Sequence, residues 1–308
     1  MKVTTDEYNS FDSLLTQYRH CISRLSQIGI SLSGASRLRT YERRLEQLVS
    51  DLRPRIETNL IIAASFDLRE IDEIIEIINH LPNPLDKATI GLLKKMNGGS
   101  DHPDDEIMAA AREAQYELFL GNMFRRTGVQ AQHGAPDLVV HWKKQDFFIE
   151  AKRPSSFNRV DDRLRSAIHQ IRRLPSTGII ALSLDQVVRP PGGLLTVKEF
   201  DDLAPAVHHL VTSFVLNNAG LWRKRLTGEP VSAILMTARI PGRVTSTGHS
   251  ALGSNIHVEL LSVPSEKTDV HGFINYALSA YDGDQIETVS KLVTGDKDDF
   301  VIKKEEKN

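Results

Sequence analysis

Residues 136–154 read Pro-Asp-Leu-Val-Val-His-Trp-Lys-Lys-Gln-Asp-Phe-Phe-Ile-Glu-Ala-Lys-Arg-Pro, and this stretch decides the expected fold. Two runs with strand-like side chains, Leu138–Trp142 and Asp146–Lys152, flank the short polar connection Lys143–Gln145. Strand-forming runs joined by a short polar connection predict a β-hairpin.

The second strand ends in charged residues. Side chains alternate along a strand, so Glu150 and Lys152 share one face, whereas Ile149 and Ala151 share the other. The hairpin brings Asp137, at the start of the first strand, close to Glu150. Charges at the end of an apolar strand need a reason, because burying them without partners is costly. Two carboxylates supply the hard oxygen ligands that Mg²⁺ prefers, and a nearby Lys can orient water or offset charge on a phosphate.

The pair Pro136-Asp137, followed by Glu150-Ala151-Lys152 on the next strand, resembles the motif of the PD-(D/E)XK nuclease superfamily. That superfamily includes restriction endonucleases, Holliday-junction resolvases and many repair or defence nucleases. The resemblance covers roughly residues 105–185 and implies an α/β fold, with a restriction-endonuclease-like mixed sheet flanked by helices. It implies Mg²⁺, with Mn²⁺ as a substitute, bound by Asp137 and Glu150 and by the Ala151 carbonyl. Lys152 would act on water or on the transition state.

A helix is expected before the hairpin, from the Asn97–Ser100 linker to about Arg126, with Gly128 just past its end. Nucleases of the superfamily commonly complete the metal site with a Glu from this helix. Glu117 is the preferred candidate, because it lies about three turns before Gly128. Glu113, one turn earlier, is the reserve. The alternative for either residue is an ordinary solvated helix carboxylate.

A second helix is expected over Arg159–Leu174, followed by a buried strand over Thr177–Asp185. Some nucleases that the chain resembles carry a functional Gln in this helix, within a Gln-x-x-x-Tyr pattern. Gln170 matches the first position, but Leu174 stands where the Tyr would be, so the signature is incomplete. Helix, hairpin, helix and strand is the order expected of the superfamily core.

Basic residues concentrate around the motif. Residues 121–175 contain 11 Lys or Arg and five Asp or Glu, although the whole chain has a net charge of −2. Basic side chains beside a metal site can neutralise backbone phosphates. The alternative is a solvated basic face without a ligand. The residues expected to contact nucleic acid, with DNA favoured, are Arg153, Arg163, Gln170 and Arg173.

The whole chain has the composition of an ordinary globular protein, with 308 residues, 40% hydrophobic and 25% charged. Cys21 is the sole cysteine, which excludes an internal disulfide framework and suits the reducing cytoplasm. The sequence begins without an apolar signal core, and no apolar run is long enough to span a bilayer. We therefore expect a cytoplasmic protein without membrane contact. An ATPase motif is absent, so a helicase or ATPase partner would be a separate chain.

Three regions are expected: a helical region over 1–96, a nuclease-like α/β domain over 101–295 and a charged tail over 296–308. Apolar residues recur at helical spacing in the first region, which is interpreted as a packing or homodimerisation module. The other interpretation is a DNA-gripping or regulatory arm. Its support is a run of four basic residues, Arg37, Arg39, Arg43 and Arg44.

Local signals are weaker after residue 186. Thr196-Val197-Lys198-Glu199 has the form of a capping box and predicts the start of a helix. Pro205 is expected to begin another helix. Val231–Ala238 and Ile256–Val263 are expected as strands joined by a Gly/Ser/Thr-rich connection.

The sequence therefore predicts a metal-dependent nuclease, with a role in defence, restriction or repair suggested by association alone. The alternative is a catalytically inactive module with the nuclease fold, serving nucleic-acid binding or complex assembly. The presence of Asp137, Glu150 and Lys152 together disfavours that alternative. A third interpretation, an interaction protein with a chance match to the motif, is disfavoured by the order of the elements.

Overall fold

The computed structural model describes residues 5–6, 11–50, 58–98, 106–190, 194–247, 250–261, 269–282 and 289–292. The helices are α1 (Phe11–Gln27), α2 (Arg37–Ser50), α3 (Thr58–Asn79), α4 (Lys87–Met96), α5 (Glu106–Arg126), α6 (Phe157–Ile171), α7 (Leu203–Asn217), α8 (Ala219–Leu226) and α9 (Val270–Asp282). A 3₁₀ helix covers Phe200–Asp202. The strands are β1 (Thr5–Asp6), β2 (Gln130–His133), β3 (Leu138–Trp142), β4 (Gln145–Lys152), β5 (Gly178–Ser183), β6 (Leu195–Val197), β7 (Val231–Val244), β8 (Ser250–Leu261) and β9 (Val289–Leu292).

The strands form one mixed sheet in the order β1-β8-β7-β5-β4-β3-β2, with β6 on β7 and β9 on β8. Its centre is parallel, because β5 runs alongside both β4 and β7 in the same direction. The flanks are antiparallel, formed by β2 and β3 on one side and by β8 on the other. The predicted α/β class with a mixed sheet is confirmed at this level.

The hairpin of β3 and β4 forms as predicted, and its register positions the motif. Lys143 and Lys144 make the turn, with φ of 45° and 65°, so Gln145 belongs to the second strand and pairs with Trp142. The pairing between β3 and β4 stops at Leu138 and Ile149. The last three residues of β4 extend beyond it and pair with β5.

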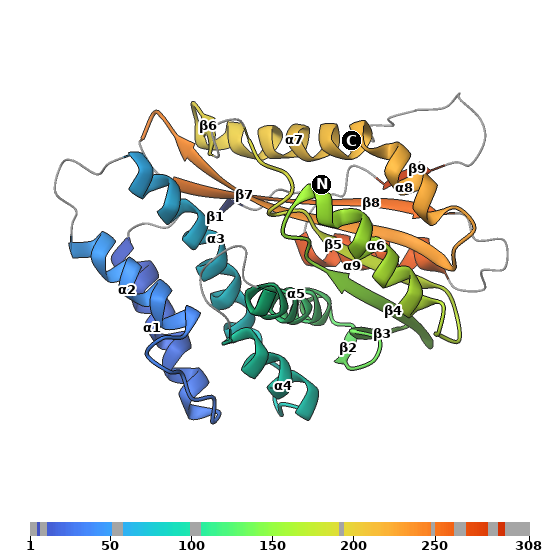
Figure 1. Cartoon of the computed structure of the whole chain (residues 1–308), viewed down its shortest axis with the longest axis horizontal. Helices are drawn as coiled ribbons and strands as arrows, with labels where there is room; N and C mark the ends of the chain where they lie inside the picture. Colours follow the sequence, from blue (N-terminus) through green and yellow to red (C-terminus); the bar gives the residue numbers. More distant parts are fainter. Residues whose placement is uncertain are drawn as a thin grey trace, which may run out of the picture.

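Helices cover both faces of the sheet (Figure 1). One hydrophobic core joins α1–α5 and α9 to one face of the sheet, and it extends from Leu14 to Leu278. A second core packs α6, α7 and α8 against the opposite face, around residues such as Leu164, Val211 and Trp222. The first core is continuous across the boundary expected at Asn97–Ser100, because α3 and α5 pack against each other and both contact the sheet. Residues 99–105 and the expected tail at 296–308 lie outside the described ranges.

Several predicted elements have the expected bounds within a few residues. Helix α5 ends at Arg126, and Gly128 follows with a φ of 81°, as its C-terminal position predicts. The helix predicted at Thr196 is wrong, because Leu195–Val197 instead forms β6 and pairs with the end of β7. The capping box lies further on, between Glu199 and Asp202 around the 3₁₀ helix. In the described part of the chain, no helix has the length and apolar character needed to cross a membrane.

Candidate active site

The candidate site lies where β4 extends past β3. Beyond Ile149, the edge of β4 that faces β3 has lost its strand partner. The side chain of Asp137 fills part of this gap, since the Ala151 N–H donates to Asp137 Oδ2 at 2.9 Å. Asp137 therefore caps the free edge of β4 and is held next to the other motif residues, Glu150 and Lys152.

Lys152 connects the two carboxylates of the motif. Its Nζ donates to Asp137 Oδ2 at 3.2 Å and to Glu150 Oε2 at 3.1 Å. The Glu150 side chain is 2% exposed, whereas that of Asp137 is 19% exposed, so solvent reaches the group from the aspartate side. Burial lowers the pKa of Lys152, but the two carboxylates outweigh this effect and raise the pKa, so the amine stays protonated.

Helix α5 adds two further carboxylates beside Asp137. Burial and the charge of Asp137 raise the pKa of Glu117 to about 8. The same two causes, in the same order, raise the pKa of Glu150 to about 7. The pKa of Glu113 is also raised, chiefly by burial, and its Oε1 lies 2.9 Å from Arg163 Nη1. Asp137 is thus close enough to Glu117 and Glu150 for like-charge repulsion, whereas Glu113 is paired with a cation from α6.

This donor set fits a hard divalent cation in its chemistry. Carboxylate oxygens that repel one another, at a partly exposed point, are suited to Mg²⁺ or Mn²⁺. Burial and the charge of Asp137 disfavour the ionised forms of Glu117 and Glu150, and a bound cation would favour those ionised forms. The described residues nevertheless contain no group of three His, Cys, Asp or Glu side chains already arranged around one point. The oxygens of Asp137 and Glu150 converge on the Lys152 amine instead.

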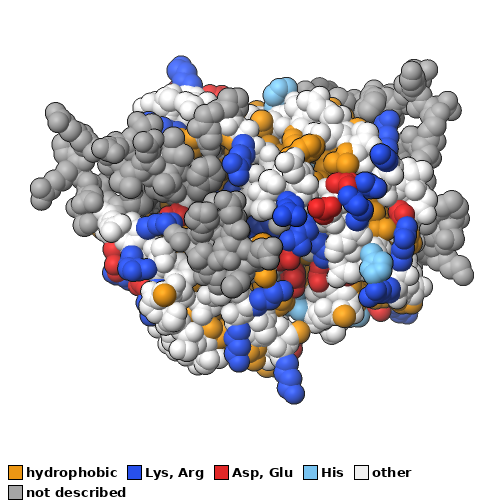
Figure 2. Space-filling view, viewed as in Figure 1, with side chains coloured by type: hydrophobic (Ala, Val, Ile, Leu, Met, Phe, Trp, Pro, Cys, Tyr) orange, Lys and Arg blue, Asp and Glu red, His pale blue; other side chains and the backbone are white. Residues whose placement is uncertain are grey.

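A basic residue of α6 contacts one of the carboxylates of α5. Figure 2 shows acidic side chains near the middle of one face, with Lys and Arg side chains around them. Arg163 is in direct contact with Glu113, which places it at the site. Gln170 is half-buried and lies close to Ser166, and Arg173 is exposed in the turn that follows α6. The prediction that Arg163 and Arg173 both belong to the helix is therefore correct for Arg163 only.

Arg153, which the sequence places among the expected nucleic-acid contacts, does not lie on the surface. The strand alternation that puts Lys152 on one face turns Arg153 to the other, where it is 3% exposed. Its guanidinium makes two bonds to Glu73, at 2.9 and 3.1 Å, and one to Asp185 Oδ2 at 2.9 Å. Burial lowers the pKa of Arg153, but these carboxylates raise it by a larger amount. The net change is an increase, so the residue stays charged.

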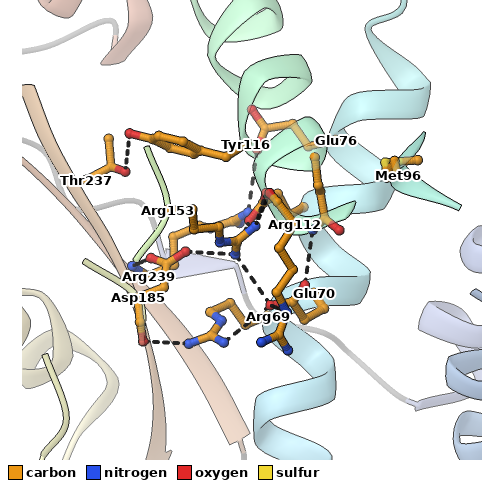
Figure 3. A network of polar contacts seen from close by, with 12 residues as sticks. Arg69, Glu70, Glu76, Met96, Arg112, Tyr116, Arg153, Asp185, Thr237 and Arg239 are labelled. Carbon is orange, nitrogen blue, oxygen red and sulfur yellow. Dashed lines mark hydrogen bonds and ion pairs between the residues drawn. The ribbon is translucent and has the colours of Figure 1, made fainter. Parts of the chain in front are cut away.

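Arg153 belongs to a buried ionic network that was not predicted from the sequence (Figure 3). Glu70 and Glu73 of α3 contribute carboxylates, and both are at most 1% exposed. The network joins α2, α3, α5, β7 and the residue directly after β4, through Arg37, Arg69, Arg112, Arg153 and Arg239. The available signal was the two charged pairs Arg69-Glu70 and Asp72-Glu73 in a helix rich in Ile and Leu.

The basic run proposed as a DNA-gripping arm does not form one surface. Arg37 is 0% exposed and donates to Glu70 Oε2 at 3.2 Å and to Gln115 Oε1 at 2.6 Å. Arg39 pairs with Glu42, and Arg44 pairs with Asp67. The helical periodicity of α2 therefore divides these arginines between the interior and the surface.

No protein-family model matches the sequence, and no curated protein matches it. The chemistry of the site is therefore the guide to function, since a fold alone does not fix one.

Proposed function

We propose that this chain is a metal-dependent nuclease of the PD-(D/E)XK type, with a restriction-endonuclease-like sheet, and that it hydrolyses phosphodiester bonds in DNA. The observation that carries this proposal is the convergence of Asp137, Glu150 and Lys152 at the end of β4. The motif residues come from two strands, and the register of the hairpin brings them within hydrogen-bonding distance.

Asp137 and Glu150 are the proposed ligands of Mg²⁺ or Mn²⁺, and Glu117 and the Ala151 carbonyl complete the donor set. The bound ion would supply Lewis-acid stabilisation of the phosphate and an acidified water. Lys152 is the proposed catalytic cation. Its amine remains protonated beside the carboxylates, so it can offset negative charge that develops on the scissile phosphate.

The charge around the site supports a polyanionic substrate. Arg163 lies against Glu113 and is partly exposed, with 34% of its side chain accessible. A phosphate can take the place of Glu113 on this guanidinium, because Arg binds phosphate and carboxylate oxygens with the same geometry. Arg173 is exposed in the turn after α6. These two arginines are the proposed phosphate contacts.

Two substitutions separate the role of the metal ligands from that of the cation. Asp137→Ala is expected to abolish most cleavage and much of the affinity for Mn²⁺, because it removes a ligand. Lys152→Ala is expected to abolish most cleavage as well, but to retain Mn²⁺ binding. The measurements are calorimetric Mn²⁺ titration and cleavage of linear, circular and single-stranded DNA with Mg²⁺, Mn²⁺ or EDTA.

Lys198→Ala provides the matched control, because the Lys198 side chain is 83% exposed and lies outside the site. It is expected to leave both metal affinity and cleavage unchanged. Wild-type protein that cuts none of the DNA substrates while its circular dichroism shows a folded chain would contradict the proposal. Equal cleavage by the wild type and Lys152→Ala would remove Lys152 from the mechanism.

A catalytically inactive module for nucleic-acid binding or assembly remains the second candidate, and one observation favours it. The Lys152 amine bonds to both Asp137 and Glu150, so the carboxylates of the motif are partly neutralised without a metal. This candidate predicts DNA binding that is equal in EDTA and in Mn²⁺, together with no heat of Mn²⁺ binding. The titration described above distinguishes the two candidates.

A further inference from the structure

The end of β4 is weakly supported by the sheet itself. Glu150, Ala151 and Lys152 pair with β5 on one side, but β3 no longer pairs with them on the other. The Ala151 N–H relies on a side chain, Asp137, for its hydrogen bond. Small shifts of this short segment would therefore move Glu150 and Lys152 away from Asp137. Another part of the molecule is needed to hold it in place.

Arg153, the residue directly after Lys152, is fixed far more strongly. Its side chain enters the layer of α3 and α5, where Glu73 binds both terminal nitrogens and Asp185 binds one of them. Glu70 Oε1 lies 3.4 Å from the same guanidinium. Figure 3 shows Arg153 between Asp185 and the residues of α3. Bidentate Arg–carboxylate pairs restrict geometry as well as contribute energy.

Glu73, like the more distant Glu70, comes from outside the nuclease-like region, and it makes the shorter contacts with Arg153. It lies on α3 and is 80 residues away from Arg153 in sequence. Asp185, in contrast, follows β5, the neighbouring strand of β4. Helix α3 also contacts α5, which carries Glu117. The helical region is therefore attached to the carboxyl end of the motif strand and to the helix that carries the third carboxylate.

We propose that Glu73 is a positioning residue, which acts through Arg153 to hold the end of β4 so that Glu150 and Lys152 face Asp137. The inference rests on the proposed function for its catalytic consequence and gives the helical region a role in the site. Glu73 itself lies on the other side of the sheet and contacts neither Asp137 nor Lys152. Its effect on the chemistry would be exerted entirely through the backbone of residues 150–153.

The test compares Glu73→Gln with Asp72→Asn. Asp72 directly precedes Glu73 in α3 and forms a buried ion pair with Arg239 of β7, so its substitution also damages the network but is expected to leave the contacts of Arg153 intact. Both variants are expected to lose thermal stability, and kcat is measured at a temperature where each is folded. Glu73→Gln is expected to lower kcat at least tenfold with unchanged affinity for DNA in EDTA. Asp72→Asn is expected to keep kcat within twofold of the wild type.

Amide hydrogen exchange gives a readout that does not depend on cleavage. In Glu73→Gln, the amides of residues 150–153 are expected to exchange at least tenfold faster relative to those in the centre of β5. In Asp72→Asn, this ratio is expected to remain at the wild-type value. A merely stabilising role of Glu73 would instead speed exchange in both variants to the same relative extent.

The outcomes separate the two proposals. Equal kcat values and equal exchange ratios in the two variants would overturn the positioning role. If the wild type cleaves no substrate, equal exchange ratios alone would overturn it. Selective exchange at residues 150–153 in Glu73→Gln supports the anchor, even with a wild type that cleaves nothing, and in that case only the nuclease proposal fails. Reduced kcat in Glu73→Gln with an unchanged exchange ratio would also overturn the role, since the effect would not pass through β4.

Discussion

His133 is expected to make the protein sensitive to acid. It lies at the end of β2, is 8% exposed, and its ring nitrogens make no hydrogen bond within the described part of the chain. Burial, followed by the charge of Arg125, lowers the pKa of His133 from 6.5 to about 4. The folded state therefore binds this proton less tightly than the unfolded state does.

The size and sign of the effect follow from these two pKa values. The stability that depends on a neutral His133 is fully present above pH 6.5. It is lost as the pH falls from 6.5 through 4, because the unfolded chain takes up the proton before the folded chain does. The complete shift corresponds to about 3 kcal/mol of unfolding free energy. Between pH 7 and pH 5 the expected loss is about 2 kcal/mol.

The assay compares urea unfolding of the wild type and of His133→Leu at both pH values. Leu has a similar size and cannot titrate, so the difference between the two chains isolates His133 from other groups such as Glu117 and Glu150. The wild type is expected to lose about 2 kcal/mol more than the variant on acidification. At pH 7 the variant should be at least as stable, because it removes polar atoms without partners. The same pH dependence in both chains would refute the reasoning.

Three further predictions concern other parts of the structure. Gly121→Ala is expected to destabilise the fold by about 1–3 kcal/mol in urea unfolding, because a Cβ there would lie 2.6 Å from the His133 ring; an unchanged midpoint would contradict this packing. Arg153→Met is expected to cost about 3–5 kcal/mol in the same assay, since it leaves the buried Glu73 carboxylate without its guanidinium partner. Arg163→Ala combined with Arg173→Ala is expected to weaken DNA binding and to flatten its salt dependence by about two counterions; an unchanged slope, measured by fluorescence anisotropy, would place the DNA path elsewhere.

Local sequence was enough to predict the hairpin and the helices around it. The alternation in β4 identified the shared face of Glu150 and Lys152, and the short polar connection fixed the partner strand that carries Asp137. Gly128 marked the end of α5, because a left-handed residue is needed there. These signals act over a few residues, so the local sequence is enough to determine the hairpin and the end of α5.

Distant parts of the chain decided the features that differ from the prediction. Thr196 and Val197 lie in a strand because β7 offers them a partner edge, and this pairing outweighs a local helix signal. Arg153 lies in the interior because Glu73, 80 residues earlier, and Asp185, 32 residues later, neutralise it there. A charged side chain is buried only where the fold supplies its partners, and those partners are fixed by tertiary packing and not by the neighbouring sequence.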